Sequence, residues 1–87
     1  MTDDTLGSPH IPDTLTFGQK AVGVSFNPSG DERVDECKHA FADIIDALHV
    51  LRVTSPGGSE AVRLASVAIT QAQQAQMWAV KALTWKD

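Results

Sequence analysis

The fold is decided by one stretch near the end of the chain, Arg63-Leu-Ala-Ser-Val-Ala-Ile-Thr-Gln-Ala-Gln-Gln-Ala-Gln-Met-Trp-Ala-Val-Lys-Ala-Leu-Thr-Trp85. Alanine recurs here at alternating steps of four and three residues, which places the smallest side chain in a line on one face of a helix. The alanines occupy positions 61, 65, 68, 72, 75, 79 and 82. Apolar residues also lie on the other faces, so this helix is expected to be surrounded by protein.

An earlier stretch, about residues 31–53, predicts another helix of similar length. Ser29 and Glu32 have the spacing of a capping box at its start, and the Pro56-Gly-Gly58 turn ends it. Its apolar residues follow an a/d spacing and are Val34, Cys37, Phe41, Ile44, Leu48 and Leu51. The sequence therefore predicts an all-α fold, an antiparallel hairpin of helices at about 31–53 and 60–84. The first helix supplies bulky side chains and the second an alanine groove.

The part of the chain before the hairpin divides in two. Residues 1–14 are polar and rich in proline and glycine, which predicts a flexible N-terminal arm. Residues 15–26 are apolar but interrupted by glycine, so we expect a short helical turn or an extended segment that packs on the hairpin. Residues 15–87 then form a single helical-hairpin domain.

The small size of the chain predicts a compact homo-oligomer. A domain of 87 residues buries little surface and is commonly stabilised by disulfides, a metal or oligomerisation. The single cysteine, Cys37, cannot form an internal disulfide and is interpreted as a buried thiol in a reducing compartment. No Cys/His cluster has zinc-ligand spacing. The residues that the hairpin leaves partly uncovered are the expected interface: Met77, Trp78, Val80, Leu83 and Trp85, with Phe17, Val22 and Phe26 as further candidates.

Composition and motifs exclude several classes of function. The N-terminus lacks signal-peptide features and no apolar run approaches the roughly 20 residues of a membrane span, so a cytosolic protein that contacts no membrane is expected. The net charge of −4 argues against binding of DNA or RNA polymers. No nucleophile elbow, phosphate-binding loop or HExxH motif is present. We therefore expect neither an enzyme nor a cofactor or metal site.

The few cations are the candidates for binding a small anion. Arg63 follows a Gly-Gly-Ser turn at a helix start, where free backbone N–H groups and a guanidinium together suit a phosphate. From composition alone, a surface arginine remains the alternative. Lys20, Lys38 and Lys81 are the other candidates, from the N-terminal apolar segment, the first helix and the end of the second helix.

Four segments resemble the helical-hairpin domain of phage anti-CBASS cyclic-oligonucleotide sponges, which is shared with the Thoeris anti-defence sponges. The resemblance covers about residues 24–85. It is strongest in the second helix, where Arg63, Thr70, Met77 and Lys81 follow one another at intervals of seven, seven and four. The segments are Phe26–Asp31, Val34–Lys38, Arg63–Thr70 and Ala75–Ala82.

The resemblance implies a non-enzymatic protein that forms compact hexamers in the cytoplasm of an infected bacterial host. Such a sponge sequesters cyclic dinucleotides, and in some cases cyclic trinucleotides, without cleaving them, and so blocks CBASS immune signalling. By position, base stacking falls on Phe26 and phosphate binding on Lys38, in a cyclic-dinucleotide pocket. Arg63 is implied as the phosphate ligand of a cyclic-trinucleotide pocket where three protomers meet. Family members often carry tyrosine in place of Phe26.

Two alternatives remain open at this point. Related sponges bind ADP-ribose-derived signals, so that ligand class competes with the cyclic oligonucleotides. The other alternative is a homo-oligomeric helical interaction or adaptor module with no nucleotide ligand. In that case Phe26, Lys38 and Arg63 are packing and surface residues.

Overall fold

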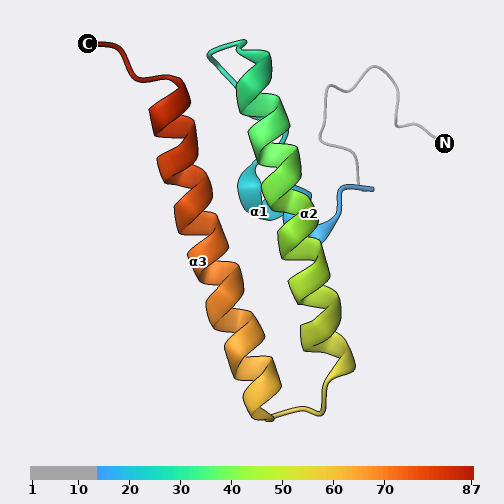
Figure 1. Cartoon of the computed structure of the whole chain (residues 1–87). Helices are drawn as coiled ribbons and strands as arrows, with labels where there is room; N and C mark the ends of the chain where they lie inside the picture. Colours follow the sequence, from blue (N-terminus) through green and yellow to red (C-terminus); the bar gives the residue numbers. More distant parts are fainter. Residues whose placement is uncertain (1–13) are drawn as a thin grey trace, which may run out of the picture.

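The computed structural model describes residues 14–87, which form three helices and no strand. The short α1 spans Phe17–Val22, and the long helices are α2, Glu32–Thr54, and α3, Glu60–Leu83. α2 and α3 lie side by side and antiparallel, with α1 against α2 (Figure 1). The predicted all-α hairpin is therefore confirmed. The predicted arm at 1–14 lies outside the described residues except for Thr14.

The ends of the long helices follow from local hydrogen bonding. Asp31 is the N-cap of α2 and accepts a hydrogen bond from the Arg33 N–H at 2.8 Å, while Ser59 caps α3. The predicted cap at Ser29 is wrong, because Gly30 has a left-handed φ of 69° and a helix cannot run through it. The Ser29 hydroxyl instead accepts a hydrogen bond from the Asp31 N–H at 3.1 Å.

The short helix α1 packs closely on α2 because of Gly18. The Gly18 N–H donates a hydrogen bond to the Asp46 carboxylate at 2.6 Å. A Cβ added at Gly18 would lie 2.1 Å from the Ala42 carbonyl oxygen, so only glycine permits this approach. A capping box formed by Thr16 and Gln19 starts the helix. The segment expected to be a helical turn or an extended strand is therefore a short, capped helix.

Packing of α1 against α2 determines which face of α2 is buried. Ile45 is fully buried and Ala42 nearly so, whereas Ile44 and Leu51 are about half exposed. The a/d line predicted for α2 is therefore wrong at Ile44 and Leu51. It assumed one partner helix, but α2 has two, and its buried face lies between them. The core consists of Val22, Ala42, Ile45 and Ile69, with Ala21, Val24, Phe41, Leu48 and Ala72 packed against it.

The alanine line of α3 faces α2 only in part. Ala65 is buried, but Ala61, Ala75 and Ala82 are exposed, and the larger Ile69 and Gln76 point inward instead. The alanines at positions 65, 72 and 79 are buried or partly buried, whereas those at 61, 75 and 82 are exposed. Steps of seven residues keep a side chain on nearly the same face of a helix, so one set of the alternating line faces α2 and the other set turns outward. The predicted alanine groove is therefore wrong at Ala61, Ala75 and Ala82.

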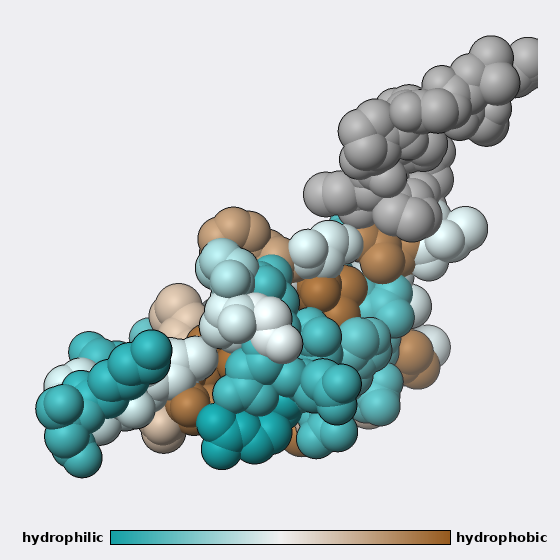
Figure 2. Space-filling model, turned by 90° about the horizontal axis from the view of Figure 1, so that it is seen from above, coloured by the Kyte–Doolittle hydropathy of each residue, from teal (hydrophilic) through white to brown (hydrophobic). Residues whose placement is uncertain are grey.

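Much apolar surface stays uncovered in the single chain. Trp78 and Trp85 are more than half exposed, as is Met77, while Val80 and Leu83 are partly buried. Val22 is wrong as an interface candidate, because it is buried in the core. Figure 2 shows brown apolar side chains reaching the surface between teal polar ones. None of the helices described in residues 14–87 is both long enough and apolar enough to span a membrane. The other large exposed apolar residues are Phe17, Phe26, Ile44, Val50, Leu51, Val53, Leu64 and Val67.

Candidate functional site

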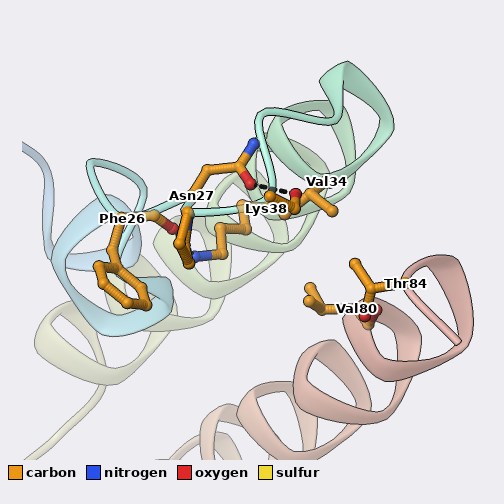
Figure 3. Close-up of a pocket in the computed structure, with 8 residues that line it drawn as sticks. Phe26, Asn27, Val34, Lys38, Val80 and Thr84 are labelled. Carbon is orange, nitrogen blue, oxygen red and sulfur yellow. Dashed lines mark hydrogen bonds between the residues drawn. The ribbon is translucent and has the colours of Figure 1, made fainter.

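The loop between α1 and α2 brings Phe26 and Lys38 together. The Lys38 ammonium lies 5.5 Å from the centroid of the Phe26 ring, within the range of a cation–π interaction. The Phe26 side chain is open to solvent, with 69% of the residue exposed, whereas Lys38 is only 6% exposed. Figure 3 shows the lysine running beneath the loop that carries Phe26.

The Lys38 ammonium is held by backbone oxygens. It donates hydrogen bonds to the Gly23 carbonyl at 3.0 Å and to the Phe26 carbonyl. Within residues 14–87 no carboxylate forms an ion pair with it. An ammonium has three N–H donors, so one remains for a ligand. Lys38 therefore ties the loop to α2 in addition to presenting a positive charge, a role that its position in the sequence did not predict.

Two pockets meet at the Phe26 ring. The first, about 270 Å³, lies between the loop, α2 and the end of α3 (Figure 3). The second, about 320 Å³, lies beside α1 and includes Lys20. Of the predicted ligand residues, Lys38 lines the first pocket, Lys20 lines the second, and Phe26 lines both. The first pocket is lined by Phe26, Asn27, Pro28, Ser29, Val34, Lys38, Val80 and Thr84.

Asn27 fixes the loop next to Phe26. Its side-chain amide donates hydrogen bonds to the Asp31 carbonyl at 2.9 Å and to the Asp35 carboxylate at 3.0 Å, and accepts one from the Ser29 hydroxyl at 2.6 Å. The amide therefore holds the turn against the start of α2. Asn27 is not among the predicted ligand residues, although Asn-Pro is a recognised turn signal and predicts the break in the chain here.

Arg63 lies at the other end of the hairpin. Residues 63 and 80 are 17 positions apart on α3, which corresponds to roughly 25 Å. Arg63 therefore cannot reach the first pocket of its own chain. Its guanidinium Nε donates a hydrogen bond to the Glu60 carboxylate at 2.9 Å, which lowers the pKa of Glu60 and raises the pKa of Arg63. The arginine is exposed, and Glu60 is its ion-pair partner.

Lys81 belongs to a third location. Its ammonium lies 5.4 Å from the Trp78 ring centroid, beside an open hollow of about 380 Å³ on α3. Gln74 and Met77 complete this hollow. The five predicted ligand residues therefore occupy three places: the Phe26 pockets, the Trp78 hollow and the start of α3.

The described part of the chain contains no group of three or more His, Cys, Asp or Glu side chains placed to hold a metal ion. Cys37 is partly buried and free. The only ion pairs described between residues 14 and 87 join Arg33 to Asp31 and Arg63 to Glu60.

Comparison with known proteins gives a family match. The family model described as "Acb2/Tad1, hairpin domain" matches residues 19–84. This range includes both long helices, the Phe26–Lys38 loop and Arg63. No curated protein and no solved structure matches the chain.

Proposed function

This chain belongs to the Acb2/Tad1 hairpin-domain family, and from that premise we propose that it is an anti-defence sponge for cyclic oligonucleotides. It binds cyclic dinucleotides, and at a second site cyclic trinucleotides, and so blocks CBASS signalling in the cytoplasm of an infected bacterium. It acts by stoichiometric sequestration and leaves the messenger intact.

The observation that carries this proposal is the pairing of an exposed aromatic ring with a restrained lysine. A nucleobase can stack on the open face of Phe26, and stacking is worth roughly 1–3 kcal/mol per base. The remaining N–H of Lys38 and the nearby Lys20 ammonium attract the phosphates of the same ligand. A cyclic dinucleotide is a small dianion with two flat bases, and this pair of groups suits it.

The size of the pockets supports a site completed by another protomer. Ligand sites commonly measure about 300–1,000 Å³, and the pocket at Lys38 measures about 270 Å³. It is open and holds only part of a cyclic dinucleotide. The exposed apolar residues of α2 and α3 provide surfaces on which further copies can pack. We propose a homo-hexamer in which neighbouring chains close each pocket.

Arg63 is proposed as the phosphate ligand of the second site. A guanidinium binds phosphate through parallel N–H donors, as it binds Glu60 in the free chain. Within one chain Arg63 lies at the opposite end of α3 from the pocket at Phe26, and we assign it to a separate site. Lys81 is a further proposed contact for the ligand, with Trp78 beside it as a second aromatic face.

The test is calorimetric titration with cyclic di- and trinucleotides, linear dinucleotides and an ADP-ribose-type ligand. Phe26→Leu should weaken cyclic-dinucleotide binding about 5- to 150-fold, because it removes the aromatic face. Phe26→Tyr is the matched control and should retain binding. Chromatography of the ligand after incubation should show no product. Unchanged affinity in Phe26→Leu, or cleavage of the ligand, would contradict the proposal.

The exposed tryptophans also favour the second candidate, an oligomeric adaptor module without a nucleotide ligand. The two candidates separate when protein purified from cells containing an active cyclase is heated. A sponge releases cyclic nucleotide on denaturation, and an adaptor releases none. Release of an ADP-ribose derivative instead would redirect the proposal to that class of messenger.

A further inference from the structure

A separate hollow of about 310 Å³ lies where α1 meets α3. The side chains around it carry amides, a hydroxyl and a thioether, and none of them is charged. Such a lining suits a neutral polar group and not a phosphate. The lining residues are Ala21, Thr70, Gln73, Gln74, Gln76 and Met77.

Gln76 is the residue that most needs a partner. It is 6% exposed, and its side-chain amide makes no hydrogen bond to any residue in the described range 14–87. Its neighbour Gln73 makes one long contact, from Nε2 to the Ala21 carbonyl at 3.5 Å. A buried amide without a partner is costly, because it has given up its hydrogen bonds to water. A ligand that supplies those bonds would therefore bind here with a net gain.

The amide of glutamine matches the edge of a nucleobase. It presents one acceptor and two donors in a plane and pairs in a bidentate manner with N6 and N7 of adenine. The thioether of Met77 adds a polarisable contact for an aromatic ring. The hollow has room for a single base, which is also a neutral group.

The hollow lies on the same edge of α3 as the Phe26–Lys38 pocket. Gln73, Gln76 and Val80 are spaced three and four residues apart, and Val80 lines that pocket. Gln76 precedes Val80 by one helical turn, roughly 6 Å along the axis. We propose that Gln76 reads the edge of a nucleobase, adenine in preference to others, of the cyclic ligand bound at Phe26 and Lys38. This inference rests on the proposed function and adds its base preference.

The test uses the full chain and three cyclic dinucleotides, with two adenines, two guanines or two uracils. The wild-type protein should bind the adenine ligand about tenfold or more tightly than the uracil ligand. Gln76→Leu should lose this difference and retain its affinity for the uracil ligand. Gln76→Glu, of similar size but without the amide donors, should lose it as well. Gln71→Leu, at an exposed position of α3, is the matched control and should keep the difference.

Each other outcome counts against the inference. Equal wild-type affinity for the three ligands, or an adenine preference that survives in both Gln76 variants, overturns base reading by Gln76. If both variants lose affinity for all three ligands equally, with thermal unfolding unchanged, Gln76 has a general role in the site. That result also overturns base reading by Gln76. A folded wild-type protein that binds none of the ligands refutes the proposed function, and the inference falls with it.

Discussion

At the scale of single residues, Lys38 both tethers the loop that carries Phe26 and presents a positive charge beside the Phe26 ring. Its charge is buried, and buried charges are normally paired or coordinated. Here two backbone carbonyls and the Phe26 ring take the place of a carboxylate. The charge is therefore stabilised without being neutralised, which leaves a positive group beside an exposed ring. That combination is what an anionic ligand with a flat base requires.

Replacing Lys38 by methionine should loosen the loop while keeping most of the buried stem. The Gly23 and Phe26 carbonyls lose their shared donor, and hydrogen exchange of the Phe26 amide should become about tenfold faster. That amide donates to the Gly23 carbonyl at 2.9 Å in the closed loop. Lys20→Met, at an exposed lysine of the adjoining pocket, is the control and should leave exchange unchanged. Identical exchange in wild type and Lys38→Met would rule out the tethering role.

Arg63 and Glu60 make a pH-dependent pair. The hydrogen bond from Arg63 lowers the pKa of Glu60, so the stabilisation is present above the ordinary carboxylate pKa and is lost as the pH falls through the lowered value. In Arg63→Gln the pKa of Glu60 should rise, as followed by NMR titration of its carboxyl carbon. Arg33→Gln is the control, because Arg33 lowers the pKa of Asp31 and not that of Glu60. If the pKa of Glu60 stayed low in Arg63→Gln, a group other than Arg63 would be responsible for lowering it.

At the scale of elements, the position of α1 decides the shape of the site. The loop between α1 and α2, which carries Phe26, starts at Gly23, where α1 ends with a left-handed φ of 65°. Docking of α1 on α2 depends on Gly18 and on its hydrogen bond to Asp46. The loop is therefore held at one end by helix packing and at the other by Asn27 and the α2 cap.

Gly18→Ala should displace α1 from α2. The new methyl group would overlap the Ala42 carbonyl oxygen, and overpacking of this kind costs about 1–3 kcal/mol of unfolding free energy. Gly57→Ala, with no atom within 4 Å of the added Cβ, is the matched control and should be close to neutral. Chemical denaturation measures both. Equal stability of the two variants would show that the close contact is relieved at no cost.

At the scale of the whole molecule, the proposed homo-oligomer would cover apolar surface that the single chain leaves exposed. Its core is small, and large apolar side chains stay exposed on both long helices. Large apolar side chains that are exposed together commonly mark interaction surfaces, and this is the physical reason for the proposed assembly. Oligomerisation would bury these residues and close the half-open pockets in one step.

Trp78→Glu should lower the mass of the assembly measured by light scattering after size-exclusion chromatography. The tryptophan is exposed in the single chain, and a carboxylate at a buried interface would be desolvated without a partner. His39→Glu introduces the same charge on the exposed polar face of α2 and should leave the mass unchanged. A wild-type protein that is already monomeric would contradict the proposed assembly.

The sequence by itself determined the two long helices and where they end. Helical periodicity, the Pro56-Gly-Gly58 turn and the capping residues act within a few positions of one another, so they can be read locally. The capping prediction failed by two residues because it took the side-chain spacing of Ser29 without the backbone conformation of Gly30. The sequence also put Phe26, Lys38 and Lys20 forward as ligand residues.

Only the tertiary structure decided which faces are buried and what the candidate residues do. The docking of α1 moved the buried face of α2 to Ala42 and Ile45, enclosed Lys38 and placed its ammonium on two carbonyls. It also set Gln76 at the edge of a hollow. These features depend on contacts between segments far apart in the chain, and the periodicity of a helix does not reveal a second packing partner. Local rules therefore gave the elements, and long-range packing gave the site.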